Sequence, residues 1–279
     1  MRKARELDVR WVFLALAAAL TLAVRFPFSQ PITPSPAVKA VYDYIEALPE
    51  GSTILIATDY DPQARAEVVP ITQALLRHAF SRGIRVIGMT FWPDGAPLGA
   101  RLFRDIGDEY GKTSGVDYVY LGYKFGGMAQ VITNMGESFT SAFPADPEGN
   151  RTATMPVFEE VRNLRSVDYL IDIAAGETVT AWVMYGADKY RIPMAAGCTA
   201  VVGPDLYVFM NTGQLNGLIA GLRGAADYEV LIGSPDLGVR GMPAQSAAHG
   251  MIVLFVIVAN VLYFRKRLSL RSRRQAERD

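Results

Sequence analysis

Hydrophobic and polar positions divide the chain into three parts. Two stretches without charged side chains, residues 11–24 and 241–264, lie near its two ends. A helix of about twenty apolar residues matches a hydrocarbon core of about 30 Å. The pattern therefore predicts a transmembrane helix at each end and a folded domain between them. The predicted segments are residues 1–10, 11–28 (helix 1), 29–240 (domain), 243–264 (helix 2) and 265–279.

Basic residues lie on the terminal side of both apolar stretches. Because cytoplasmic flanks of membrane helices are enriched in Lys and Arg, both termini are predicted in the cytoplasm and the domain outside it. The lipid bilayer is thus the first predicted partner. The flanking residues are Arg2, Lys3, Arg5 and Arg10 before the first stretch, and Arg265, Lys266 and Arg267 after the second.

The first apolar stretch has a second interpretation. It is short, and a basic start followed by a short apolar run also describes a cleaved secretory signal peptide. Arg25, Phe26 and Pro27 follow it directly, in place of a small-residue cleavage site. This favours an uncleaved signal anchor.

Between the membrane segments, short apolar runs alternate with amphipathic helical patterns. The runs are apolar throughout, as strands of a parallel sheet buried on both faces require. We therefore expect an α/β three-layer sandwich with a mostly parallel, Rossmann-like sheet of about five strands. The predicted strands are residues 53–57, 84–89, 118–121, 169–173 and 192–195, and the predicted helices include 98–110, 157–164 and 179–190. Residues 139–155 form the one long predicted loop.

Composition restricts the chemistry of the domain. The 28 basic and 28 acidic residues balance, which gives no support for a nucleic-acid partner. A single cysteine, Cys198, excludes an intrachain disulfide, and its small-residue surroundings favour a buried, unreactive thiol. His78 lies in a helical pattern beside Arg77, where a surface position is expected.

Polar residues follow the predicted strands at their carboxyl ends, where open α/β sheets bind ligands. Asp172 lies inside a strand and needs a partner, because a buried carboxylate is desolvated. The candidate ligand-binding residues are Asp59, Asp61, Thr90, Trp92, Asp94, Lys124, Gly126, Gly127, Asp172 and Glu177.

Asp59-Tyr60-Asp61 has two interpretations. As a carboxylate pair it fits Mg²⁺ or acid–base chemistry, and with Lys124 and Asp172 it makes a metal-assisted hydrolase. As a turn, the two aspartates bond backbone amides ahead of Pro62. Asp-x-Asp after a first strand also resembles the opening motif of haloacid-dehalogenase-type phosphatases; the likeness covers these three residues. No cofactor is expected except Mg²⁺ for that hydrolase.

The turn at residues 124–127 also has two interpretations. Its Lys124, Gly126 and Gly127 precede a helical segment and offer amides to a phosphate, but they lack the spacing of standard phosphate loops, which favours a tight strand-to-helix turn. With Trp92, the same glycines line the pocket of a solute-binding sensor in a third functional interpretation.

Residues 212–222 carry Gly213, Gly217 and Gly221 at intervals of four. In a helix these glycines form one flat stripe that admits another helix closely. The stripe either packs inside the domain, binds a second copy or lies on the membrane surface. Asn260, deep in the second apolar stretch, either bonds a neighbouring helix or its own backbone.

These patterns favour a non-catalytic role. The leading hypothesis is a membrane-anchored extracytoplasmic module that assembles with itself or docks another membrane protein in a membrane or envelope complex, for example one associated with a transporter. Gly213, Gly217, Gly221 and Asn260 are its candidate interface residues. The alternatives are the hydrolase and the solute-binding sensor.

Overall fold

A computed structural model of the protein describes residues 9–28 and 30–276, with side chains as far as Leu268. It separates into two compact units. One is the domain, Ile32–Val239, and the other contains the two ends of the chain, Met1–Pro31 and Arg240–Asp279.

Six strands form one sheet within the described residues, and every neighbouring pair is parallel. Their order is β3-β2-β1-β4-β5-β6. The strands are β1 (Thr53–Asp59), β2 (Arg85–Thr90), β3 (Tyr118–Tyr123), β4 (Tyr169–Ala174), β5 (Met194–Cys198) and β6 (Gly217–Ala220). The predicted parallel α/β architecture is confirmed, and β6 is the strand that the sequence pattern does not predict.

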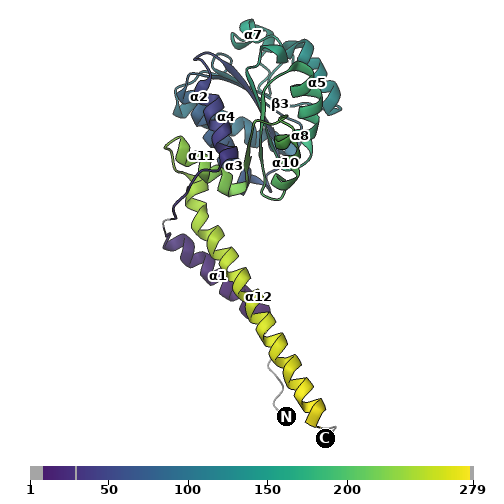
Figure 1. Ribbon diagram of the computed structural model, residues 1–279. Coiled ribbons are helices and arrows are strands. Elements are labelled where there is room, and N and C mark those ends of the chain that lie inside the picture. The colour runs from purple at the N-terminus through teal and green to yellow at the C-terminus, as the bar shows by residue number, and fades with distance from the viewer. Residues whose placement is uncertain (1–8, 29, 277–279) are drawn as a thin grey trace. The chain divides into compact units, whose positions relative to one another are not determined.

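Helices cover both faces of the sheet (Figure 1). One face carries α2 (Pro36–Ala47), α3 (Arg65–Ser81), α4 (Ala96–Glu109) and α11 (Gly221–Leu231). The other carries α5 (Met128–Glu137), α8 (Thr178–Ala181) and α10 (Gly203–Asn211). The shorter elements are α6 (Phe139–Ala142), α7 (Val157–Glu160), α9 (Asp188–Tyr190), the π-helical η4 (Trp182–Ala187) and the 3₁₀ turns η1 (Pro93–Gly95), η2 (Thr152–Thr154) and η3 (Leu164–Ser166).

Strand β1 lies at the centre of the sheet and is buried along its whole length. Its side chains alternate between two hydrophobic clusters, with Leu55 and Ala57 in one and Ile54 and Ile56 in the other. Both faces of β1 therefore pack against helices, which explains why this strand is apolar throughout.

The helix expected over residues 212–222 is wrong. Gly213 lies in a turn with φ of 76°, Gly217 begins β6, and Gly221 begins α11 with φ of 61°. The three glycines, although spaced by four residues, therefore do not lie on one face of a helix. Gly217 is buried, and a Cβ there would overlap Val41 and the backbone of α2, so this glycine serves packing inside the domain.

Two other segments differ from the prediction. Residues 157–164 form only the single turn of α7 before the chain bends, and β5 starts two residues after the predicted strand. The long segment 139–155 is packed: Phe139, Phe143 and Thr152 are buried, and Thr152 Oγ1 donates to the carbonyl of Phe143.

Both apolar ends of the chain are helical. Helix α12 (Leu237–Ala276) contains, at Leu237–Leu268, the one segment of the described residues that is long and apolar enough to cross a membrane. Helix α1 (Val9–Arg25) has 17 residues and spans about 26 Å, slightly less than a hydrocarbon core. Within α12, Asn260 Nδ2 donates to the carbonyl of Val256 at 3.0 Å, so its amide bonds its own helix.

The packing of Gly217 gives a testable prediction. Gly217→Ala should lower the free energy of unfolding by about 1–3 kcal/mol, because the added methyl group meets Val41 and the backbone of α2. Gly127→Ala is the matched control, since no described atom lies within 4 Å of a Cβ built there. Thermal unfolding of the full chain in mild detergent, followed by circular dichroism, measures both variants. Equal melting temperatures would contradict the packing.

Candidate functional site

The order of strands reverses between β1 and β4, and the carboxyl ends of these strands carry two aspartates. Asp59 is the last residue of β1, and Asp172 lies opposite Ala57 in the register of β1 with β4. Asp59 is two positions beyond Ala57, so both carboxyl groups point to the same face of the sheet. Both residues are 0% exposed. The sheet thus places a carboxyl pair at the point where open α/β folds usually bind ligands.

Asp59 is held by donors from two connecting segments. Its Oδ1 accepts the backbone N–H of Phe91 at 2.6 Å, just after β2, and its Oδ2 accepts Nε1–H of Trp182 at 3.0 Å. Trp182 opens the π-helical turn η4 and is fully buried. Two N–H donors stabilise the ionised form of this carboxyl, against the cost of burying its charge.

Asp172 has fewer donors. Its Oδ2 accepts the hydroxyl of Thr178 at 2.9 Å, while Oδ1 is buried and accepts no donor from the described residues. The carboxyl groups of Asp59 and Asp172 are close enough to shift each other's pKa. Two neighbouring buried carboxylates repel each other, so we infer that one of them is protonated, and we place the proton on Asp172, whose ionised form has fewer donors.

Burial sets the protonation of the pair. It raises the pKa of Asp59 to about 6, although the N–H donors of Phe91 and Trp182 act against this shift. It raises the pKa of Asp172 well above its ordinary range, and the charge of Asp59 raises it further. The pair therefore shares one proton near neutral pH, as a carboxylic acid bonded to a carboxylate.

The other predicted hydrolase residues lie apart from this pair. Asp61 Oδ1 accepts the backbone N–H of Gln63 at 2.8 Å and of Ala64 at 3.3 Å, which is the turn interpretation of this residue. Lys124 directly follows β3, the strand at the edge of the sheet, and its Nζ lies 5.4 Å from the ring centre of Phe143. The structure brings Asp59 and Asp172 together and joins neither Asp61 nor Lys124 to them.

Most of the remaining candidates lie at the surface. Trp92, Asp94, Gly126, Gly127 and Glu177 are exposed. Thr90 is buried beside the pair: its Oγ1 lies 2.7 Å from the carbonyl oxygen of Thr58 and 3.3 Å from Oδ1 of Asp59. Gly127 is the residue before α5, as a tight strand-to-helix turn requires. Lys124 lines an open depression of about 400 Å³ with Tyr123, Phe143 and Pro144.

Two residues that sequence reasoning placed elsewhere are buried. Cys198 lies in β5 beside Ala174, and burial, with the charge of Asp172, raises the pKa of its thiol to about 12, which confirms the expectation of an unreactive thiol. His78 is 2% exposed, so its expected surface position is wrong. Trp182, the indole donor to Asp59, was not predicted, and a tryptophan eight residues after the end of β4 carries no pattern that identifies it.

Comparisons with known proteins add a fold likeness only. No protein-family model and no curated protein matches the chain. One similar solved structure is the C-terminal domain of a group 1 family glycosyl transferase (LpcC) from Francisella tularensis, with 14% identity and a TM-score of 0.31, covering 80% of this chain and 94% of that one. Another is the trehalose-6-phosphate synthase OtsA, with 11% identity and a TM-score of 0.30, covering 85% of this chain and 45% of that one.

The carboxyl pair predicts how stability depends on pH. The folded-state pKa of both groups lies above the value of about 3.9 for an unfolded aspartate, so the folded protein binds more protons and loses stability as the pH rises through its own pKa values. Between about pH 4, where an unfolded aspartate titrates, and about pH 6, the pKa of Asp59, we expect a loss of roughly 1–3 kcal/mol. Asp172→Asn should remove most of this loss, because its amide donates to Asp59 without a titrating proton.

Urea unfolding of the full chain in mild detergent, repeated across that pH range, measures this effect. Asp61→Asn is the matched control: it replaces an aspartate that accepts only backbone N–H groups of its own turn. A pH dependence that is the same in Asp172→Asn and in the parent protein would show that the pair shares no proton.

Proposed function

We propose that this protein is a membrane-anchored, extracytoplasmic α/β module that acts without catalysis, as an assembly or docking component of a membrane or envelope complex. The observation that carries the proposal is the junction of the domain with α12. The last residues of the domain, Leu237–Val239, are the first turn of that helix, and the helix continues to Ala276. A domain that passes directly into an apolar helix is built to act at a membrane.

The carboxyl pair supports a structural role for the sheet edge. Asp59 and Asp172 are fully buried, Asp59 accepts the indole N–H of Trp182, and the residues that a metal-assisted hydrolase needs beside them, Asp61 and Lys124, make other contacts. A substrate would reach neither carboxyl without a rearrangement of the side chains that bury them. This favours docking over hydrolysis.

A two-pass arrangement completes the proposal. Helix α1 supplies the second apolar segment, and the basic residues near Arg10 and Arg267 support a cytoplasmic position of both termini. The domain then lies outside the cytoplasm. In this proposal the protein either associates with a second copy of itself or binds another membrane protein. Asn260 is the candidate contact residue within the bilayer.

The proposed topology is tested with single cysteines. Cys198 is buried with a raised thiol pKa, so it gives a silent background for labelling. We expect a membrane-impermeant maleimide to label Glu177→Cys in intact cells, and to label Arg267→Cys only after permeabilisation, because these exposed positions lie on opposite sides of the membrane. Labelling of Arg267→Cys in intact cells would contradict the topology.

The proposed assembly is tested by particle mass. The chain has a mass of 30.5 kDa. Light scattering of the full chain in mild detergent, with the detergent contribution subtracted, should give a defined multiple of that mass or a complex with a second protein. Asn260→Leu should weaken the assembly, and Val256→Leu, one turn away, is the control. A monomer in detergent that also forms no cross-linked product in native membranes would overturn the assembly role.

A further inference from the structure

Helix α11 carries three consecutive buried polar residues, Asp227, Tyr228 and Glu229, each at most 2% exposed. A buried carboxylate is costly unless donors surround it. The donors here come from the two segments that connect the domain to the rest of the chain. Each of the three residues holds a different part of the domain.

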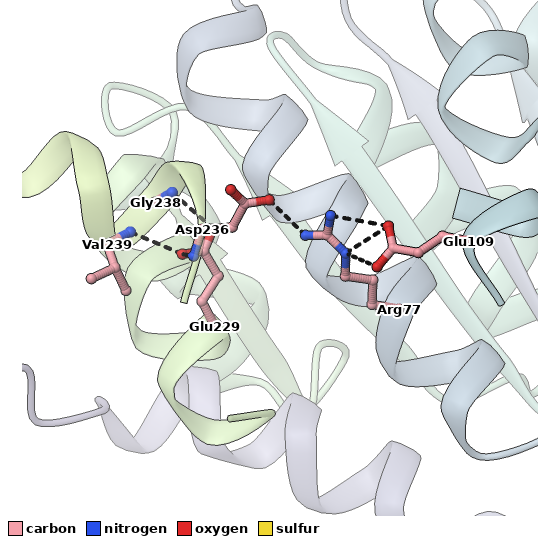
Figure 2. Close-up of polar contacts among 6 residues, drawn as sticks. All are labelled: Arg77, Glu109, Glu229, Asp236, Gly238 and Val239. Atoms are coloured by element: carbon pink, nitrogen blue, oxygen red, sulfur yellow. Dashed lines mark hydrogen bonds and ion pairs between the residues drawn. The ribbon is translucent and has the colours of Figure 1, made fainter. Parts of the chain in front are cut away.

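Glu229 holds the first turn of α12. Its carboxylate accepts three backbone N–H groups, those of Asp236 at 2.7 Å, Gly238 at 2.8 Å and Val239 at 2.9 Å (Figure 2). These groups have no carbonyl partner inside the helix, because they belong to its start. A negative charge at a helix N-terminus is also favoured by the helix dipole.

Arg77 of α3 strengthens this contact. Its guanidinium pairs with Asp236 at 2.8 Å and with Glu109 of α4 at 3.0 Å (Figure 2). The residue just before α12 is therefore tied to α3 and α4, as well as to α11.

Asp227 holds the segment that enters the domain. Its Oδ2 accepts the backbone N–H of Ser35 at 3.0 Å, and its Oδ1 accepts Arg223 at 2.8 Å. Arg223 in turn donates to the carbonyl of Thr33 at 3.2 Å. One helix thus holds both the entry and the exit of the domain.

Tyr228 lies between these two contacts and bonds a buried histidine. Its hydroxyl is 2.7 Å from Nδ1 of His78, and Nε2 of His78 is 3.0 Å from Oε1 of Glu46. Glu46 is a carboxylate and can only accept, so Nε2 carries the proton and Nδ1 accepts from Tyr228. The ring of Tyr42 stacks on His78 with 4.8 Å between ring centres.

Protonation of His78 would reverse this arrangement. Nδ1–H would become a donor, and the Tyr228 hydroxyl, which is fully buried, would have to turn its own proton toward another acceptor. The groups that face the ring are Tyr42 and Glu46 from α2, Arg82 directly after the end of α3, and Tyr228 from α11. Arg82 disfavours the cation and Glu46 favours it.

The opposing effects of burial and of Glu46 on the pKa of His78 leave the ring neutral in the folded protein at neutral pH. Burial lowers its pKa, and Glu46 opposes that effect only in part. A folded-state pKa below the unfolded value of about 6.5 means that the folded protein binds fewer protons, so acid removes stability as the pH falls through about 6.5.

We propose that α11 is an acid-sensitive coupling element: protonation of His78 displaces Tyr228 and loosens the hold of Asp227 and Glu229 on the two segments that lead out of the domain. The structural basis is that the three contacts share one turn of one helix. Acid on the outer side of a membrane would then free the start of α12 before the sheet is disturbed.

Hydrogen exchange of the full chain in lipid nanodiscs tests the proposal. The readout is a peptide with the amides of Gly238 and Val239, at about pH 7.5 and about pH 5.5 and corrected for intrinsic exchange. We expect its protection to fall about tenfold in acid, while a peptide from α5 on the other face of the sheet stays protected. In His78→Gln the acid response should disappear, because the amide can donate to Glu46 and accept from Tyr228 without titrating.

Two further variants complete the test. Glu229→Gln should reduce protection of the same peptide at both pH values, which shows that the peptide reports the contact. If His78→Gln does not fold, Tyr228→Phe replaces it and should reduce the acid response, because no hydroxyl proton then loses its acceptor. Full protection in acid, equal loss in the parent and in the His78 or Tyr228 variant, or equal loss in the α5 peptide would each overturn the proposal.

Discussion

The burial of β1 on both faces is the constraint on which the rest of the domain depends. A strand at the centre of a parallel sheet must be covered by helices on each side, and its carboxyl end lies under the segments that lead into those helices. Asp59 ends this strand and therefore cannot reach water. Its negative charge is accommodated by the amide of Phe91, the indole of Trp182 and the acid form of Asp172. The groups that bury the carboxyl end of β1 therefore also compensate the charge of Asp59.

The domain accommodates buried acidic groups in two different ways. At the sheet edge, we infer that two carboxyls share a proton, because Asp172 accepts only the Thr178 hydroxyl from the described residues. On α11, the carboxyl group of Glu229 accepts three backbone N–H groups, and that of Asp227 accepts one N–H and a guanidinium. The stability of the Asp59–Asp172 pair depends on pH, because the pair itself titrates. The stability of the carboxyl groups on α11 depends on the chain segments that provide their donors. Acidic residues thus hold both the centre of the sheet and the ends of the domain.

Much of the fold follows from local pattern. Ser35 caps the start of α2 by accepting the N–H of Val38, and Pro36 is the first residue of that helix. The apolar runs locate five strands, because a parallel strand covered by helices on both faces carries apolar side chains on both. Strand β6 escapes this reasoning because it has four residues, and the glycine interval across it equals the repeat of a helix. Only positive φ values at Gly213 and Gly221 break that repeat, and they are a property of the folded backbone.

The candidate site was less predictable, for a physical reason. Asp59 and Asp172 are separated by more than a hundred positions, and only the strand order places them side by side. A sequence shows the carboxyl ends of strands but not which strands are neighbours. Likewise, the adjacent Arg77 suggests a surface position for His78, whereas its burial depends on Tyr42 and Tyr228 from two other helices.

The continuity of the domain with α12 also decides where the two can be separated. A protease that cut in the turn near Gly233 would remove the three N–H donors of Glu229 from the fragment that contains it, and would leave a buried carboxyl group without those partners. A cut beyond Val239 would keep those donors with the released fragment. A released domain that stays folded must therefore carry the first turn of α12.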